Sequence, residues 1–287
     1  KYVFSYEITS NGKVIRSDQL PILHIEPEQS NIVTVNLDNL PPNPGVEYFI
    51  KFSAKTIAAE NLLPAGWEIA SEQFKIPIEV PKKQFNTANT EKVNYNEGTN
   101  IEISGKDFSL VIDRKSGIIT SYKNNGKELL LNGFGPRPTF WRAPTDNDYG
   151  WRMPQVCCLW KQVSEQELSA RNLKINQAGN SVKVEVEYNL EPVKSAWKTE
   201  YTVMGNGAVK VENLFVTSDT TMPVIPRVGM KLQMPSEYAQ LEYFGRGPWE
   251  NYNDRKSSTF IGQYKSTVAE QYVPYIRPQE NGHRTDV

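Results

Sequence analysis

The chain alternates apolar and polar residues from its start, which predicts β-strands rather than helices. Asn11-Gly12 is a strong hairpin signal that turns the first strand into a returning one, and a proline-rich breaker at 41–45 separates two later strands. The strands expected in this part of the chain are 2–8, 13–16, 33–37, 48–54 and 67–76. Short strands with turn signals at this spacing predict an immunoglobulin-like β-sandwich over residues 1–78.

Residues 79–98 lose this periodicity and become polar, which predicts a linker and a domain boundary. Strands resume beyond it, and the most regular alternation runs over 182–190, followed by 197–203 and 209–211. Such strands have one buried and one solvent-facing side, so residues 99–287 are expected to form a large antiparallel sandwich. The predicted fold class is therefore all-β.

Helical spacing occurs in one stretch, where positions i, i+3, i+4 and i+7 are Val156, Leu159, Trp160 and Val163. Pro154 suits the first turn of that helix. Nowhere do strands alternate with helices of about 10 to 15 residues, which excludes a β/α barrel and a dinucleotide-binding sheet from this chain.

Composition narrows the function classes further. With 32 basic and 33 acidic residues, the formal net charge of -1 provides no basic field for a phosphate backbone, so nucleic acid is not an expected partner. No run of about 18 apolar residues and no signal-peptide core occur, so we expect a soluble fragment, cytoplasmic or periplasmic, with no membrane partner. Cys157 and Cys158 are adjacent, which strains a disulfide, so both are predicted to be reduced.

Most catalytic constellations lack their parts. The sequence has no G-x-S-x-G elbow, no phosphate-binding glycine loop and no C-x-x-C, and its histidines are His24 and His283. Glycoside hydrolysis needs only two suitably spaced carboxylates, so counting residues does not exclude it. The position of the carboxylates has to decide.

The first candidate cluster lies within residues 140–150. On an extended segment Asp146 and Asp148 would point the same way, roughly 6.5 Å apart, and could hold a cation or a pair of sugar hydroxyls. With Arg142 and Asn147 they are the carbohydrate-facing or loop-organising candidates of this cluster. Alternatively the segment is an Asx-turn loop pinned by Arg142. Asp146 and Asp148 are thus weak candidates for a metal site.

The second cluster, residues 243–255, mixes glycines, aromatic residues and both charge signs, as a loop at the rim of a carbohydrate cleft would. Its candidate residues are Trp249, Glu250, Asn251, Asp254 and Arg255. Alternatively Glu250 and Asp254 pair with Arg246 and Arg255 and only fix the loop.

The third cluster, residues 274–284, contributes Glu280, Asn281 and His283. Glu280 and His283 could act as an acid/base pair. Alternatively, the histidine is a surface group beside a turn.

Three segments in this order resemble the C-terminal small-chain region of β-galactosidases of glycoside hydrolase family 2. They are Arg142-Ala143-Pro144-Thr145-Asp146-Asn147-Asp148, Gly247-Pro248-Trp249-Glu250-Asn251-Tyr252-Asn253-Asp254-Arg255 and Pro278-Gln279-Glu280-Asn281-Gly282. Residues 1–78 are similar, with weaker motifs, to the immunoglobulin-like domain that precedes the small-chain domain in that family. The resemblance therefore spans nearly the whole chain.

This resemblance implies a five-domain parent enzyme that hydrolyses terminal non-reducing β-D-galactose residues with retention, using two glutamates in a central barrel absent here. Residues 99–287 would adopt the supersandwich fold of galactose mutarotases, incomplete at the C-terminus, and provide scaffold, oligomer contacts and one wall of the pocket. The family's pocket-wall aromatic has no counterpart, because the chain stops at Val287.

The same resemblance implies that this chain alone is inactive and has no catalytic residue and no cofactor. Any Mg²⁺ or Na⁺ that the parent enzyme uses is expected in the missing domains. The expected partners are the barrel of the same polypeptide, a β-galactoside substrate and further copies of the parent in a homo-oligomer.

Two other functions stay open, namely a free-standing carbohydrate-binding module and a mutarotase-like sugar epimerase that uses Glu280 and His283. A sandwich that lacks its last strands would also leave apolar inner-face positions uncovered. These positions are expected among Val182, Val184, Val186, Trp197, Tyr201, Val209 and Val211.

Overall fold

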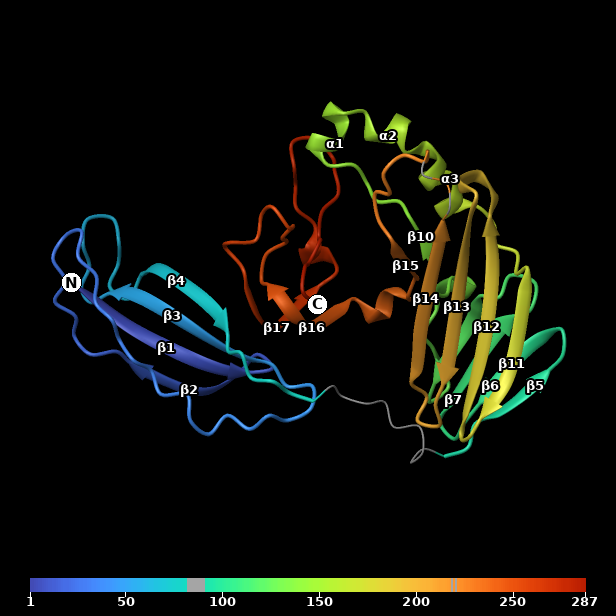
Figure 1. Ribbon diagram of the computed structural model, residues 1–287, viewed down its shortest axis with the longest axis horizontal. Helices are drawn as coiled ribbons and strands as arrows, with labels where there is room; N and C mark the ends of the chain where they lie inside the picture. Colours follow the sequence, from blue (N-terminus) through green and yellow to red (C-terminus); the bar gives the residue numbers. More distant parts are fainter. Residues whose placement is uncertain (82–90, 218, 220) are drawn as a thin grey trace. The chain divides into compact units, whose positions relative to one another are not determined.

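The computed structural model of the chain describes residues 1–81, 91–217, 219 and 221–287 (Figure 1). Its backbone contacts divide the chain into two compact units. The first unit comprises Lys1–Gln84, Ala239–Val273 and Asn281–Val287, and the second comprises Phe85–Tyr238 and Pro274–Glu280. The predicted domains 1–78 and 99–287 are continuous in sequence, whereas each of these units is assembled from separate segments.

The predicted linker, 79–98, is described only in part. Residues 82–90 lie outside the described residues. At the other end of the predicted linker, strand β5 covers Asn94–Glu97, so regular structure begins before residue 99.

A four-stranded antiparallel sheet in the order β2-β1-β3-β4 forms the N-terminal part of the first unit. Its strands are β1 (Tyr2–Ser10), β2 (Lys13–Gln19), β3 (Tyr48–Thr56) and β4 (Glu68–Lys75). The Asn11-Gly12 hairpin is confirmed, because both residues adopt positive φ and the strands on either side of them pair. A small core around Ile8, Tyr48 and Ile50 lies on one face of this sheet.

The strand predicted at 33–37 is wrong, because no strand is assigned between β2 and β3. Of the three alternating apolar residues, Val35 packs against the small core, whereas Leu37 is exposed. The prolines of this connection, at 21, 27, 41, 42 and 44, remove backbone donors on both sides of residues 33–37. Instead of a ladder, the Arg16 guanidinium donates to the carbonyl oxygens of Asn36 and Asp38, at 2.7 Å each.

The first unit also contains a C-terminal hairpin of β16 (Gln240–Gly247) and β17 (Phe260–Thr267), followed by the 3₁₀ turn η4 (Ala269–Gln271). Gln73 on β4 joins this hairpin to the sheet. Its Nε2 donates to the Ile261 carbonyl at 2.9 Å, and its Oε1 accepts from the Ile261 N–H at 2.8 Å. The Gln73 side-chain amide thereby bonds both backbone groups of Ile261, as the backbone of a neighbouring strand would.

Two antiparallel sheets make up most of the second unit, in the orders β5-β6-β7-β8-β9 and β11-β12-β13-β14, with a separate β10-β15 pair. The strands of the first sheet are β5 (Asn94–Glu97), β6 (Asn100–Ser104), β7 (Phe108–Asp113), β8 (Ile119–Asn124) and β9 (Lys127–Glu128). The others are β10 (Arg137–Thr139), β11 (Asn172–Ala178), β12 (Ser181–Leu190), β13 (Ser195–Val203), β14 (Val209–Thr217) and β15 (Gly229–Lys231). The all-β prediction is confirmed.

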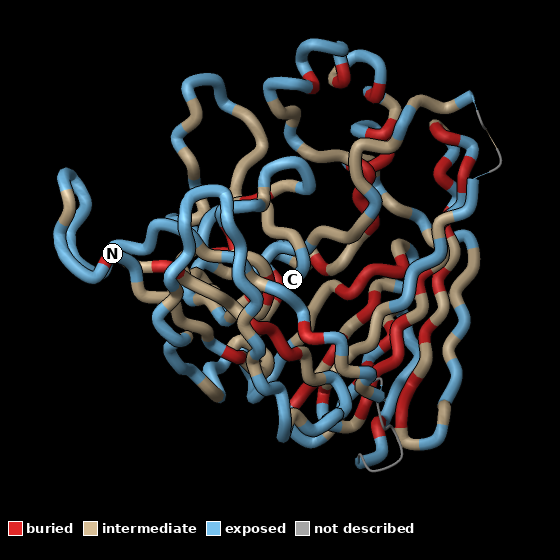
Figure 2. Tube along the Cα trace, turned by 60° about the vertical axis from the view of Figure 1, so that its left-hand side comes forward, coloured by how far each residue is buried: buried red, intermediate tan, exposed pale blue. Residues whose placement is uncertain are grey.

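The two sheets of the second unit enclose one core, visible as buried stretches along their strands in Figure 2. The positions predicted to be uncovered are in fact covered. Val182, Val184, Val186, Trp197 and Tyr201 are at most 2% exposed, and Val209 and Val211 pack against the same core. That prediction is wrong because the β5–β9 sheet, with Ile101, Ile103, Leu110 and Ile112 buried, supplies the opposing face.

Among its described residues, the second unit has three short helices, α1 (Asp146–Gly150), α2 (Met153–Val156) and α3 (Cys158–Glu165), and three 3₁₀ turns, η1 (Leu131–Gly133), η2 (Glu191–Val193) and η3 (Ser236–Tyr238). The predicted helix from Val156 to Val163 is therefore interrupted at Cys157, whose ψ of 15° departs from helical geometry. Trp160 on α3 packs against Phe140 and Phe215, with ring centroids 5.6 and 6.1 Å away, and anchors the helix on the sandwich.

The thiols of Cys157 and Cys158 are both free, as predicted. The first is buried and the second is exposed. Within the part of the chain that the structure describes, no helix is both long enough and apolar enough to cross a membrane.

Candidate functional site

The first candidate cluster is a helix start rather than an extended strand. Thr145 is the residue that caps helix α1, and Asp148 is its third helical residue, so its carboxylate accepts the Thr145 N–H at 2.8 Å. Asp146 is exposed and lies 3.6 Å from the Arg277 guanidinium, whereas Asp148 is buried. The expectation that both aspartates point the same way along an extended segment is therefore wrong.

Arg142 and Asp148 form a two-pronged ion pair. The guanidinium donates through Nη1 to Oδ2 at 2.5 Å and through Nη2 to Oδ1 at 3.1 Å. Burial alone would raise the pKa of Asp148, but hydrogen bonds from Arg142 and Thr145 outweigh it, and the pKa falls from 3.8 to about 2. Asp148 is thus held as a carboxylate, which agrees with the interpretation that Arg142 pins this segment.

Glu280 extends this cluster from the other end of the chain. Its Oε1 accepts from Arg227 Nη2 at 2.5 Å, its Oε2 lies 3.9 Å from Arg142 Nε, and its backbone N–H donates to the Pro144 carbonyl at 3.1 Å. The neighbouring Gln279 accepts the Asp146 N–H at 2.9 Å. We call Arg142, Asp148, Arg227 and Glu280 the α1 cluster. Its bonds attach segment 274–280 to the start of α1.

In the second candidate cluster Glu250 has a loop-fixing partner. Its side chain is 7% exposed, and its Oε1 accepts from Arg255 Nη2 at 2.7 Å. Its Oε2 accepts the Gly282 N–H at 2.8 Å. The predicted loop-fixing pairing is therefore present between Glu250 and Arg255. Arg246, however, bonds to Asp286 at 3.0 Å rather than to Glu250 or Asp254.

Asn251, which is fully buried, joins the two ends of this region. Its Nδ2 donates to the carbonyls of Arg246 and Trp249 at 3.1 Å each. Its Oδ1 accepts the backbone N–H and the hydroxyl of Thr285 at 2.8 and 2.7 Å. With four hydrogen bonds, the amide is saturated and works as a scaffold element.

His283 and Glu280 have separate partners. His283 Nδ1 lies 2.6 Å from the Asn251 carbonyl, and its ring stacks on Tyr252 with centroids 4.7 Å apart. Glu280 bonds to arginines of the α1 cluster. The proposed acid/base role of this pair therefore has no support in their contacts.

The remaining candidates differ in exposure. Asn147 and Asp254 are exposed, and Asn281 Nδ2 donates to the Val273 carbonyl at 3.2 Å. Trp249 is 69% exposed, although the residues around it are fixed by Asn251. Of the candidates, it therefore offers the largest free apolar surface to a ligand.

Sequence reasoning missed Arg227 and Thr285. Arg227 lies 53 positions before Glu280 in an irregular proline-containing segment, and no local pattern marks it as a partner. Thr285 follows the third motif and was not singled out, although it supplies two donors to Asn251. Among the residues with described positions, no three His, Cys, Asp or Glu side chains gather as metal ligands.

Comparison with known proteins gives the family. Residues 104–287 match the family described as "Beta galactosidase small chain", and residues 1–77 match "Beta-galactosidase, domain 4". The matched segment 104–287 covers more than half of the sequence, and the chain belongs to the β-galactosidase small-chain family.

Curated relatives agree with this assignment. The chain is 32% identical to the β-galactosidase of Priestia megaterium over 100% of its own length and 27% of the relative. It is 29% identical to that of Psychromonas ingrahamii over 98% of the chain and 28% of the relative. For the Kluyveromyces lactis β-galactosidase the identity is 34%, over 78% of the chain and 22% of the relative. The chain therefore spans about a quarter of the length of these relatives.

Proposed function

We propose that this chain is a non-catalytic part of a β-galactosidase, a glycoside hydrolase that cleaves terminal β-D-galactose residues with a retaining two-carboxylate mechanism. The carboxylates that cleave the glycosidic bond belong to another part of the same polypeptide. This chain supplies scaffold, contacts between copies of the enzyme and part of the wall of the substrate pocket. Any Mg²⁺ or Na⁺ of the parent enzyme is bound outside this chain.

The proposal rests on one observation, namely that carboxylates of the three motifs are engaged in ion pairs. Asp148, Glu250 and Glu280 each bond to an arginine of their own unit. A retaining glycosidase needs one carboxyl that stays protonated as the general acid and one free to attack the sugar. The lowered pKa of Asp148 is the opposite of what an acid requires.

Within this scaffold, Trp249 is the residue that faces ligand. Aromatic side chains that remain exposed on a fixed loop suit stacking against a sugar. Its neighbours Glu250 and Asn251 are buried and bonded, so the loop position does not depend on the tryptophan. In the intact parent enzyme, Trp249→Ala is expected to raise KM while the melting temperature stays unchanged.

The test of the main proposal is hydrolysis of o-nitrophenyl β-D-galactoside by the purified chain, produced in a host without its own β-galactosidase. The expected rate equals that of buffer. The comparison set is Glu250→Gln and Glu280→Gln, with Glu242→Gln as the control because Glu242 is 62% exposed at its side chain. Hydrolysis by the unmodified chain that disappears in either of the first two variants and persists in the control would overturn the proposal.

A further inference from the structure

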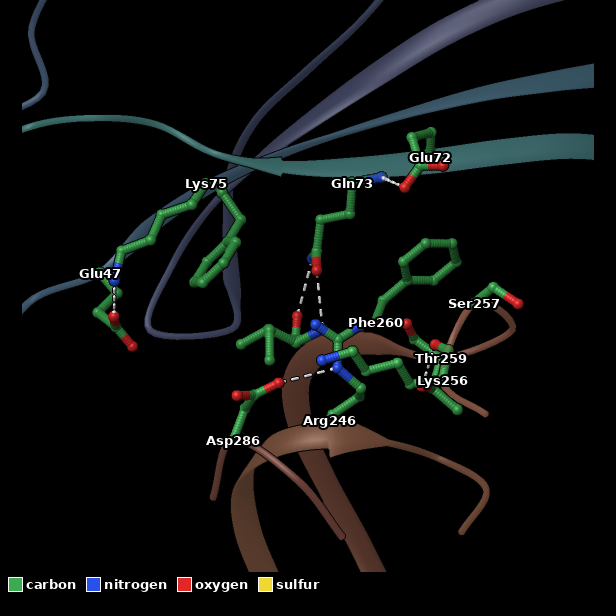
Figure 3. Close-up of a pocket in the computed structure, with 12 residues that line it drawn as sticks. Glu47, Glu72, Gln73, Lys75, Arg246, Lys256, Ser257, Thr259, Phe260 and Asp286 are labelled. Atoms are coloured by element: carbon green, nitrogen blue, oxygen red, sulfur yellow. Dashed lines mark hydrogen bonds and ion pairs between the residues drawn. The ribbon is translucent and has the colours of Figure 1, made fainter. Parts of the chain in front are cut away.

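The first unit contains a pocket of about 460 Å³ between the end of β4 and the start of β17 (Figure 3). Its volume falls within the range of small-molecule sites, about 300 to 1,000 Å³. No residue singled out as a site candidate from the sequence lines it, apart from Arg246, which the sequence suggested only as a loop partner. The pocket therefore needs its own explanation.

Its walls are fixed before any ligand enters. Gln73 forms two hydrogen bonds with the Ile261 backbone, drawn as dashed lines in Figure 3. On the other side, buried Thr259 donates its hydroxyl to the Lys256 carbonyl at 2.7 Å, and Arg246 Nη1 donates to the Thr259 carbonyl at 2.8 Å. A wall held by such bonds pays little ordering entropy on binding.

The charges that line the pocket balance. Three carboxylates and three cations face it, and two ion pairs, Glu47 with Lys75 and Arg246 with Asp286, are already formed. The hydrogen bond from Arg246 lowers the pKa of Asp286, with a smaller contribution from the charge of Lys256, so Asp286 remains an acceptor at neutral pH. A net-neutral lining with both donors and acceptors does not select an anion or a cation. It suits a neutral ligand rich in hydroxyl groups.

Aromatic surface completes the lining. Phe260, which is half-buried, and Phe49, which is buried, both line the pocket. Phe260 also carries the Lys51 ammonium 4.8 Å from its ring centroid, a contact that helps to hold the ring in place. An aromatic ring beside convergent polar groups is the usual composition of a small-molecule site.

We propose that this pocket binds a neutral mono- or disaccharide. Phe260 packs against the apolar face of the sugar ring. Asp286 accepts from its hydroxyl groups, and Lys256 and the exposed hydroxyl of Ser257 donate to them. The inference does not depend on the function proposed above, because the binding residues are distinct from the motif carboxylates and binding needs no hydrolysis.

The experiment titrates the full 287-residue chain with lactose and separately with galacturonate, with the affinity read from NMR chemical-shift changes. The pocket variants are Phe260→Ala and Lys256→Ala. The matched controls are Phe74→Ala, an exposed aromatic on β4 that does not line the pocket, and Lys265→Ala, an exposed lysine on β17. Thermal unfolding of each variant identifies any that fails to fold.

We expect saturable lactose binding with a Kd on the order of millimolar, weakened about tenfold by Phe260→Ala and about threefold by Lys256→Ala, with both controls unchanged. Galacturonate should bind no more tightly than lactose. Absence of saturation up to about 100 mM lactose, or unchanged binding in the pocket variants, overturns the proposal. Tighter binding of galacturonate overturns it as well, because the site would then select an anionic ligand. If Phe260→Ala does not fold, the lactose affinity of Lys256→Ala is the test. An affinity equal to that of the unmodified chain then refutes the proposal.

Discussion

Replacing Asp148 with asparagine tests whether the α1 cluster holds the second unit together. The carboxylate accepts four hydrogen bonds, two from Arg142 and two from Thr145. Asparagine presents one acceptor oxygen and turns an NH₂ group toward these donors. The variant therefore removes the nearer carboxylate of Arg142 and leaves Glu280, 3.9 Å away, in a site where the aspartate side chain is only 7% exposed.

The magnitude follows from the pKa. The folded-state pKa of Asp148 is about 2, against 3.8 for the free side chain. Because each pKa unit corresponds to about 1.36 kcal/mol, ionisation of Asp148 contributes about 2 kcal/mol to the free energy of unfolding at neutral pH. Loss of one partner of a buried pair also strands the other, which costs about 3 to 5 kcal/mol in full burial. Because Arg142 is 21% exposed, we expect Asp148→Asn to lower the free energy of unfolding by about 2 to 4 kcal/mol.

The pH dependence gives a second measurement. A carboxyl whose pKa is depressed on folding stabilises the protein above its unfolded pKa, and that stability is lost as the pH falls through the folded pKa. The difference in free energy of unfolding between the unmodified chain and Asp148→Asn should therefore have its full value at pH 6 and decrease between about pH 4 and pH 2. Urea denaturation followed by tryptophan fluorescence at pH 6, 4 and 3 measures it.

Asp146→Asn is the matched control. It is the same substitution two positions away on the same helix, but its side chain is 58% exposed and its ion pair with Arg277 is 3.6 Å long. The expected change is within about 0.5 kcal/mol. Equal losses in the two variants, or a loss in Asp148→Asn that stays constant from pH 6 to pH 3, would refute the reasoning.

Three further changes probe other parts of the structure. Arg142→Lys should cost about 1 to 2 kcal/mol in urea denaturation, because an ammonium cannot bond both Asp148 oxygens in the same way, and an unchanged midpoint would contradict it. Asn251→Ala should cost about 2 to 4 kcal/mol and speed proteolysis of residues 281–287, so a tail that stays protected would count against its scaffold role. Gly117→Ala should lower stability in thermal unfolding by at least about 1 kcal/mol more than Gly126→Ala. Both glycines have positive φ, but a Cβ at 117 would lie 2.3 Å from Val186 Cγ1, so similar losses in the two variants would refute this.

Strands could be predicted where local pattern and turn chemistry agreed. Over 182–190 the alternation gave β12, whose burial also alternates with a period of two, and the Asn11-Gly12 turn located β1 and β2. At 33–37 the same alternation lies between proline-containing segments, and no strand formed. Apolar alternation alone therefore does not establish strand pairing.

The candidate sites show the same division between local and distant information. Thr145 and Asp148, three positions apart, carried a helix-start signal that an extended interpretation overlooked. The partnership of Glu280 with Arg227 and that of Gln73 with Ile261 join positions 53 and 188 apart. Local periodicity carries no information at such separations, so neither the α1 cluster nor the pocket of Figure 3 could be found from it.

Side chains of the motifs that carry the family resemblance bond to backbone groups as well as to arginines. Glu250 binds the Gly282 N–H, Asn251 binds the Thr285 N–H, and Asp148 binds the Thr145 N–H. A side chain that satisfies a particular backbone donor needs an acceptor of suitable reach, so a structural requirement alone is enough to define a motif at such positions. Residues that contact a ligand are then to be sought among side chains left accessible on a fixed frame. Trp249 meets that condition on the second motif, and Phe260 with Lys256 meets it in the pocket, which is why variants at these positions separate binding from folding.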